Sequence, residues 1–285
     1  MVSTTITILK LIVTMFGVSI AATLMYPIAY IVAQALLDKP TIILTSFDQL
    51  IRYGISYKNF IDIVKDPIFW QALLNTIMVA ATTIVVAITI IIPAAYVFSR
   101  FNFRGRDALL YLYLIVSQAG GGLGIIAVLA LYIFMLRLAA HGISLFHLLA
   151  LPFIYVSGMV PFQTWLMKSY FDQLPRVLDD AAFIDGASWF NIIFRVVLPA
   201  SKAAFVIIAL FAFMGAWSEF IIASILDIMT LGKYIYESAV AGQAGIMRPA
   251  TFAAASIVYA IPIVVLFAIA QKYIGEAYRL GIAKG

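Results

Sequence analysis

Long apolar runs alternate with short polar stretches along the chain. Six runs are long enough to cross a hydrocarbon core of roughly 30 Å as α-helices, which takes about 20 apolar residues each. Because the runs are continuously apolar and do not alternate with polar positions, they exclude the strands of a membrane β-barrel. The pattern predicts an all-α, polytopic membrane protein whose six transmembrane helices cover residues 11–37, 72–98, 108–138, 145–167, 203–226 and 250–273.

Composition agrees with this prediction. The 285 residues are 65% hydrophobic and 11% charged, whereas a soluble domain of this length needs more surface charge. The first run is too long for the apolar core of a signal peptide and has no small-residue cleavage site, so we expect it to remain as a span. Since the chain has no cysteine, it offers no disulfide and no thiolate chemistry.

Basic residues gather on one side of the predicted topology. The short loop between the second and third runs carries three arginines against one acid. Because cytoplasmic loops carry an excess of Lys and Arg, this loop and both termini are expected in the cytoplasm of a cell-membrane protein. The same bias explains the net charge of +5 more simply than nucleic-acid binding does. The basic residues on the predicted cytoplasmic side are Lys10, Arg100, Arg104, Arg106, Lys168, Arg176, Arg195, Lys202, Lys272, Arg279 and Lys284.

A polar, amphipathic insert separates the fourth and fifth runs. Pro175 suits a first helical position, and Gly186 suits the left-handed residue that ends a helix. Ser188 is then placed to cap a second helix over residues 189–198, which Pro199 stops. The insert is therefore predicted to form a helix, a glycine turn and a second helix on the cytoplasmic surface.

The first of these two helices has an apolar and a charged arc. The residues on the apolar arc, which we expect to lie against the helix bundle, are Leu174, Val177, Leu178, Ala181, Ala182 and Ile184. Arg176, Asp179, Asp180 and Phe183 share the arc that is expected to face water. Phe183 among charges is either an ordinary exposed aromatic residue or a binding hot spot. We favour the hot spot because the helix has no other evident purpose.

Three sites resemble one family of transport proteins. Residues 179–187 read Asp-Asp-Ala-Ala-Phe-Ile-Asp-Gly-Ala, and a Leu-Pro pair follows at 198–199. This pattern resembles the EAA motif of the membrane subunits of binding-protein-dependent ABC importers. Gly-Ala-Trp-Ser-Glu-Phe at 215–220 and the tail Gly-Ile-Ala-Lys-Gly at 281–285 extend the likeness to the MalG-type carbohydrate permeases. The resemblance runs from about Asn75 to the C-terminus.

The resemblance implies a docking role for the insert. In that family the EAA stretch forms a coupling helix that docks in a cleft of the ATP-binding subunit. The residues to which the resemblance assigns this contact are Asp179, Asp180, Ala181, Ala182, Phe183, Asp185 and Gly186. Asp180 stands where the motif has a glutamate and reaches one methylene less far, so Phe183 is expected to carry more of the docking energy. The tail is implied to contact the ATPase through Lys284 and Gly285, unless it simply frays.

The resemblance also implies domains and partners. It divides the chain into a first helix with its outer loop, residues 1–71, and a permease core, residues 72–285, which contains the coupling loop at 170–202. Six spans are too few to enclose a path alone, so a second permease subunit is expected. The other expected partners are a dimer of ATP-binding subunits, an extracellular solute-binding protein and membrane lipid, with no nucleic acid.

Nucleotide and metal motifs are absent from the sequence. There is no G-x-x-x-x-G-K-[ST] loop, since Gly232-Lys233 is followed by Tyr234 and lacks the upstream glycine. We therefore expect no enzyme activity and no cofactor on this chain, with ATP and Mg held by the partner subunits. His141 and His147 have no carboxylate or thiol cluster beside them, so no metal site is predicted.

Polar residues within the apolar runs are candidates for lining the transport path. Glu219 is the most prominent acid within a run. It is placed either at the membrane interface beside Trp217, or facing the path or the partner permease, because a lipid-facing charge is costly. Asn75, Gln163 and Gln243 are weaker candidates for lining a sugar path.

Three consecutive glycines, Gly120, Gly121 and Gly122, interrupt the third run. Each lowers helix stability by about 1 kcal/mol relative to alanine. They fit either close helix packing or a hinge at a gate, and the sequence leaves both explanations open.

These observations predict the permease subunit of an ATP-driven importer for a sugar that an extracellular binding protein delivers. ATP binding to the partner subunits would shift an equilibrium between inward-open and outward-open states. The alternative is an ATP-independent channel or facilitator for a small neutral solute, in which the insert is only a surface loop. A membrane enzyme is disfavoured because the sequence holds no constellation of acid, nucleophile or metal ligands.

Overall fold

The computed structural model describes residues 2–240 and 247–282, and of residues 2–9, 118–125, 239–240 and 272–282 it describes the backbone only. Helices dominate these residues, and their only β pairing is an isolated antiparallel bridge between Leu37 and Ile55. The chain forms two compact units, residues 1–70 with 234–261 and residues 71–233 with 262–285. The prediction of a helical, polytopic membrane protein is confirmed.

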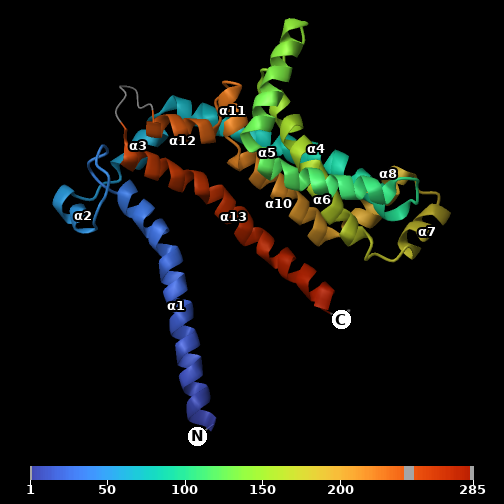
Figure 1. Ribbon diagram of the computed structural model, residues 1–285, viewed down its shortest axis with the longest axis horizontal. Helices are drawn as coiled ribbons and strands as arrows, with labels where there is room; N and C mark the ends of the chain where they lie inside the picture. The colour runs from blue at the N-terminus through green and yellow to red at the C-terminus, as the bar shows by residue number, and fades with distance from the viewer. Residues whose placement is uncertain (1, 241–246, 283–285) are drawn as a thin grey trace. The chain divides into compact units, whose positions relative to one another are not determined.

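The first unit is tied together around the end of α1. Its elements are α1 (Val2–Ala35), α2 (Asp48–Tyr53), α3 (Lys58–Lys65), the start of α4 (Pro67–Arg100), the end of α12 (Leu231–Val240) and the start of α13 (Pro249–Ile282) (Figure 1). Asn59 Nδ2 donates to the carbonyl oxygens of Ala35 and Leu37, both at 2.9 Å, and so holds α3 against the end of α1. Before that point nearly all side chains of α1 from Lys10 onward are exposed, as expected of a helix that faces lipid.

The second unit is built around α6. It contains the rest of α4, α12 and α13 and, between them, α5 (Arg106–Ala140), the 3₁₀ turn η1 (Leu148–Ala150), α6 (Leu151–Phe171), α7 (Val177–Ile184), α8 (Trp189–Asn191), the π-helical turn η2 (Ile192–Val197), α9 (Leu198–Ala200), α10 (Lys202–Ser218) and α11 (Ile221–Ile225). Helix α6 packs against α5 and α10. Ile91, Phe171, Ile192 and Ile208 are fully buried, so one core joins α4, α6, η2 and α10.

Several helices have the length and composition of membrane spans. Those found among the described residues are Lys10–Ala35, Pro67–Arg100, Leu148–Phe171 and Pro249–Gln271, and the bent pair Trp189–Ala200 with Lys202–Ser218 is a fifth candidate. Helix α5 covers the third apolar run, but the side chains in its middle are not described. The membrane-spanning character is therefore established, whereas the count of six spans stays a prediction.

The helix in the fifth apolar run ends earlier than the sequence predicts. The run extends to residue 226, but α10 ends at Ser218 and the backbone of Glu219 is extended (φ −78°, ψ 123°). Residues 221–225 then form the separate helix α11. Hydropathy cannot reveal this break, because the residues on both sides of it are equally apolar and only the side-chain contacts of Glu219 mark it.

Candidate functional site

The insert between α6 and α10 folds as the sequence predicts around its glycine. Gly186 has a left-handed backbone (φ +78°), and two backbone bonds close α7 around it: Gly186 N–H donates to Phe183 O and Ala187 N–H to Ala182 O, both at 3.0 Å. These are the bonds that typically end a helix at a left-handed residue. The insert thus contains a helix, a left-handed glycine turn and a second helix, and α7 begins at Val177 rather than at the predicted proline.

The second helix of the insert continues beyond its predicted end. Ser188 Oγ accepts a hydrogen bond from Asn191 N–H at 3.4 Å, so the predicted cap is present. The helix passes through the wider turn η2 and ends at Ala200, two residues later than predicted. Pro199 lies in the last turn of this continuous helical stretch, one residue before its end.

Helix α7 turns a charged residue inward, contrary to the predicted faces. Asp179 and Ala182, three residues apart, face the helix bundle, and Ala182 is the buried residue of α7. Val177 and Ile184, placed on the inward arc by the helical wheel, are instead 71% and 84% exposed. The face prediction is confirmed for Leu174 and Ala182, which lie against the core, and wrong for Val177 and Ile184, because the wheel weighs only hydrophobicity and ignores the charged partner that Asp179 finds on α4.

The partner of Asp179 is the C-terminal end of α4. Tyr96 OH donates to Asp179 Oδ1 at 2.7 Å. Arg100 Nη2 lies 3.0 Å from Asp179 Oδ2, as an ion pair without the alignment of a hydrogen bond. The side chains of Arg100 and Asp179 are only 8% and 13% exposed. Sequence reasoning missed this pair, although residues 96 and 100 share a helix face four positions apart.

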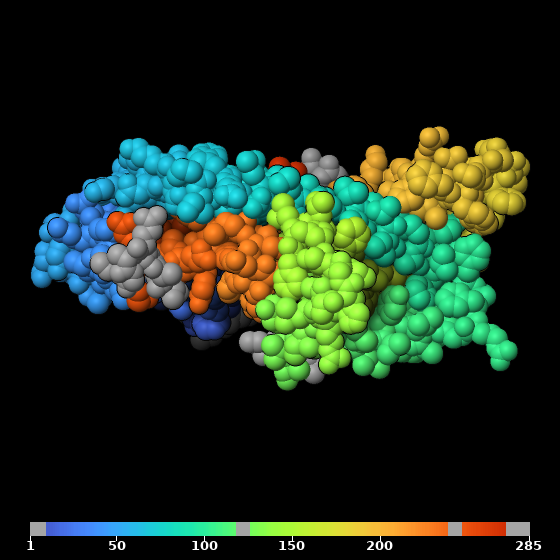
Figure 2. Space-filling view, turned by 90° about the horizontal axis from the view of Figure 1, so that it is seen from above, coloured from blue at the N-terminus to red at the C-terminus, as the bar shows by residue number. Residues whose placement is uncertain are grey.

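An exposed apolar surface covers the outer side of the insert. It consists of Val177, Phe183, Ile184, Trp189 and Phe190, each more than half exposed, and in Figure 2 the yellow atoms of this region lie at the surface. The rings of Phe183 and Trp189 are 5.9 Å apart, so they form one aromatic patch. Asp180, Ala181, Asp185 and Gly186 are exposed beside it. The expected exposure of Phe183 among charges is confirmed, at 62%.

The carboxylate of Glu219 accepts hydrogen bonds from other groups of the same chain. Its Oε2 accepts a hydrogen bond from Tyr155 OH at 2.7 Å, and its Oε1 accepts one from Ile222 N–H at 2.6 Å. Ala223 N–H also donates to Oε2, at 3.3 Å. The carboxylate therefore satisfies backbone donors at the start of α11, which have no partner within that helix.

The other path candidates lie in different surroundings. Asn75 Nδ2 donates to Met229 O at 2.8 Å, which ties α4 to the turn before α12. Gln163 is buried in α6. Gln243, Lys284 and Gly285 lie outside the described residues. Asn75 bonds to the segment 219–233 that contains Glu219, whereas Gln163 lies on α6, the helix that also carries Tyr155.

The three glycines of the third run lie within α5, whose backbone is helical through residues 120–122. A hinge at Gly120, Gly121 and Gly122 stays a prediction. The described residues hold no cluster of His, Cys, Asp or Glu that could bind a metal ion.

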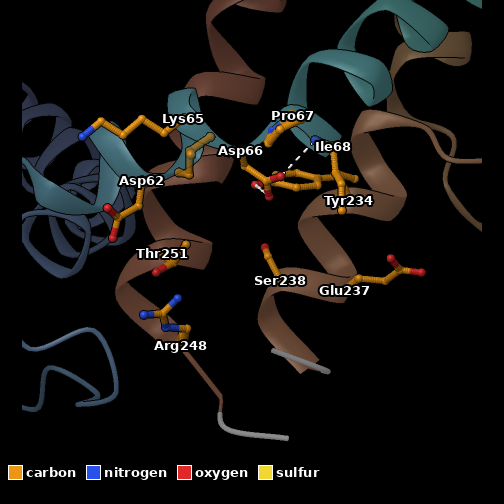
Figure 3. Close-up of a pocket in the computed structure, with 11 residues that line it drawn as sticks. Asp62, Lys65, Asp66, Pro67, Ile68, Tyr234, Glu237, Ser238, Arg248 and Thr251 are labelled. Carbon is orange, nitrogen blue, oxygen red and sulfur yellow. Dashed lines mark hydrogen bonds between the residues drawn. The ribbon is translucent and has the colours of Figure 1, made fainter. Parts of the chain in front are cut away.

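A cavity of ≈ 680 Å³ lies in the first unit, and the sequence analysis did not predict it. It is bordered by α3, the start of α4, α12 and the start of α13, with Asp62, Lys65, Glu237 and Arg248 among its lining (Figure 3). Tyr234 OH donates to Asp66 Oδ2 at 2.9 Å across one wall. Burial, and then this bond to a carboxylate, raise the pKa of Tyr234 above its usual range.

Known proteins similar to this chain are membrane subunits of importers. The family model described as binding-protein-dependent transport system inner membrane component matches residues 87–280. The maltodextrin transport system permease protein MalD of Streptococcus pneumoniae is 33% identical over 236 residues, 81% of each chain. The maltodextrin permease protein MdxG of Bacillus subtilis is 35% identical over 222 residues, 74% of each chain.

A solved structure supports the fold. In the crystal structure of a bacterial ABC transporter that imports the acidic polysaccharide alginate, one chain is 22% identical, with a TM-score of 0.69 over 91% of this chain and 96% of that one. At this identity the likeness concerns the fold alone. The family match covers more than half of the chain, and it agrees with the resemblance that the insert carries. The chain belongs to the family of inner membrane components of binding-protein-dependent transport systems.

Proposed function

We propose that this chain is a permease subunit of an ATP-driven ABC importer and that it translocates a sugar delivered by an extracellular solute-binding protein. The observation that carries the proposal is the exposed apolar surface on α7 and α8, held beside the inward-turned Asp179. A patch of aromatic and aliphatic side chains ringed by charges is typical of a protein-binding site. Its occupant is proposed to be an ATP-binding subunit.

The proposed assembly places the work of ATP hydrolysis on other chains. ATP and Mg are held by a dimer of ATP-binding subunits, and a second permease subunit completes the path. The six apolar runs support six spans, and the excess of basic residues on one side supports a cytoplasmic position for both termini and the α7–α9 insert. Residues 72–285 form the translocating core, to which residues 1–71 add the first helix and an outer loop.

A carbohydrate is the proposed substrate class. The relatives from Streptococcus pneumoniae and Bacillus subtilis are both named as maltodextrin transport permeases. Maltodextrins are neutral and rich in hydroxyl groups, which fits a chain with few charges in its apolar runs. Asn75, Gln163, Gln243 and Glu219 remain the proposed polar groups of the path, and Lys284 and Gly285 the proposed tail contact.

The docking role is tested in the complex reconstituted with its ATP-binding subunits and binding protein. We expect Phe183→Ala combined with Asp180→Ala to abolish solute-stimulated ATP hydrolysis, because both the aromatic anchor and its neighbouring charge are lost. Ile51→Ala is the matched control, since Ile51 is 88% exposed but lies in α2, in the other unit. Unchanged stimulation in the double variant would refute the docking role.

The orientation is tested on intact cells. Because the chain has no cysteine, a single Phe183→Cys variant gives an unambiguous labelling site. We expect it to react with a membrane-impermeant maleimide only after the cells are opened. Labelling from outside would place the insert on the wrong side of the membrane for an ATP-binding partner.

A further inference from the structure

Side chains in the last turn of α4 bind the connection between α6 and α7 at several points. Ser99 Oγ donates to Asp172 Oδ1 at 2.7 Å, just after α6 ends. Arg100 Nη1 donates to Leu174 O at 3.3 Å, and its Nη2 pairs with Asp179 in the first turn of α7. One helix end therefore holds three successive points of a segment that is otherwise mostly exposed.

The polar contacts of α7 with the helix bundle are few. Helix α7 packs against η2, and Ala182, together with Leu174 before α7 and Ala187 after it, lies against the core that joins α4, α6 and η2. Among the described residues, the α7 side chain that makes a polar contact with another helix is that of Asp179. The Arg100–Asp179 pair is thus the main polar tie between α7 and the helix bundle.

A buried ion pair is stiff toward separation. Both side chains are largely shielded from water, so each charge depends on the other for its stabilisation. Moving α7 away from α4 would leave two buried charges uncompensated, and this is far costlier than separating an exposed pair. Tyr96 adds a hydrogen bond to the same carboxylate and fixes its orientation.

We propose that Arg100 and Asp179, oriented by Tyr96, form the link through which a displacement of α7 is passed to α4. The inference rests on the proposed function, in which ATP-binding subunits move α7. Arg100 and Asp179 are then positioning residues: they do not contact the nucleotide or the transported solute but make α7 and α4 move as one body. The hydrogen bond from Ser99 to Asp172 connects the end of α4 to the end of α6 in the same way.

The link is tested in the complex reconstituted with ATP-binding subunits and binding protein. Asp179→Asn keeps the size of the side chain and removes the charge. We expect the ratio of solute-stimulated to basal ATP hydrolysis to fall about 10-fold, a size within the usual range of coupling between sites. The ATP-binding subunits should still co-purify in wild-type amounts, because the exposed apolar surface is intact.

Two further variants separate a link from general damage. The reciprocal exchange Arg100→Asp with Asp179→Arg should recover most of the coupling that either single change removes, since the pair is restored with opposite polarity. Asp107→Asn is the matched control: it breaks the exposed Arg106–Asp107 pair, whose carboxylate side chain is 81% exposed, and should leave coupling at the wild-type level.

Motion is measured directly with spin labels on exposed positions of α7 and α4 outside the proposed docking contact, at Leu178 and Val97. We expect the distance between the labels to stay constant between nucleotide-free and ATP-bound complexes, and to become variable when Asp179→Asn is added. Full coupling in Asp179→Asn, loss of the ATP-binding subunits from that variant, or a nucleotide-dependent distance in the otherwise unaltered chain would each overturn the link. If the wild-type chain binds no ATP-binding subunit, the proposed function itself fails, and the link with it.

Discussion

The two polar segments that flank α10 differ in how far their apolar side chains are exposed. The Asp179 segment, residues 176–200, leaves Ile184, Phe183 and Trp189 exposed. The Glu219 segment, residues 219–233, buries Ala223, Leu226 and Leu231, the last with 1% of its surface exposed. Phe220, Ile221 and Ile225 of the second segment are also exposed, at 36–45%, but no large apolar side chain in it is more than half exposed, so the first segment has the greater need of a partner.

The carboxylates of the two segments explain the difference. Asp179 pairs with a charge on another helix, so it fixes α7 while leaving the outer face of α7 free. Glu219 accepts bonds from the backbone that follows it and from Tyr155, so it closes its own segment. The Asp179 carboxylate therefore fixes α7 to another helix, and the Glu219 carboxylate stabilises the break between α10 and α11.

Matched substitutions to serine test this contrast most strongly. Leu231→Ser should lower the free energy of unfolding by about 3–4 kcal/mol, because it leaves a cavity and buries a hydroxyl group. Ile184→Ser should change it by less than about 0.5 kcal/mol, since the side chain is already exposed. Thermal unfolding of the purified chain in detergent measures both. If Ile184→Ser were as destabilising as Leu231→Ser, the apolar surface would be structural.

Removing the Glu219 carboxylate should have the next largest effect. Glu219→Ala leaves the N–H groups of Ile222 and Ala223 and the hydroxyl of Tyr155 without this acceptor. We expect a loss of about 2–3 kcal/mol of stability in detergent, from the missing cap and the missing hydrogen bonds. Glu219→Gln keeps an acceptor oxygen and should retain about half of that stability. If Glu219→Ala were as stable as wild type, the carboxylate would not be structural, and lining the transport path would be the better explanation of Glu219.

The close packing of α10 on α6 offers a smaller test. A Cβ atom on Gly215 would clash with the end of the Met159 side chain, whereas a Cβ on Gly158 meets nothing within 4 Å. We expect Gly215→Val to cost about 1–2 kcal/mol by overpacking. Gly158→Val should cost less, and Met159→Ala should relieve part of the effect in Gly215→Val. Equal melting temperatures for the two valine variants would contradict this packing.

The smallest effect is expected at the exposed end of the Glu219 segment. The hydrogen bond from the Lys233 ammonium, and its charge, hold the pKa of Asp227 below its ordinary value. A lowered pKa in the folded chain gives stability that is present above the ordinary value of about 3.9 and is lost as pH falls through the lowered value.

Asp227→Asn should therefore melt slightly below wild type between about pH 5 and 8, and the two curves should converge below about pH 4. Because the Asp227 side chain is 94% exposed, solvent screens the pair and the difference stays small. A gap between the two chains that widens on acidification would show that the carboxylate acts in another way.

The sequence was a good guide to elements and a poor guide to faces. Continuous apolar runs predict helices because a membrane span needs little else, and Gly186 predicts a turn because few other residues adopt its backbone angle. Phe183 was found because it breaks the pattern of its arc. Each of these signals is local, and each can be read from a few neighbouring residues.

What the sequence could not predict depends on residues far apart in the chain. Asp179 turns inward because of Arg100, which lies 79 positions earlier and on another helix. The break at Glu219 depends on Tyr155 and on backbone groups that hydropathy does not describe. The cavity of the first unit is assembled from segments at residues 62–68, 234–238 and 248–251. Such pairings are decided by tertiary packing, so a helical wheel or a hydropathy profile misses them.

The bend at Ser201 has a geometric consequence. Trp189–Ala200 and Lys202–Ser218 meet at 96°, so a push along the axis of one has almost no component along the other. A displacement of Trp189–Ala200 along its own axis would therefore rotate α10 about Ser201 instead of compressing α10. Over the 17 residues of α10, about 25 Å at 1.5 Å per residue, each degree of swing carries the far end sideways by about 0.4 Å.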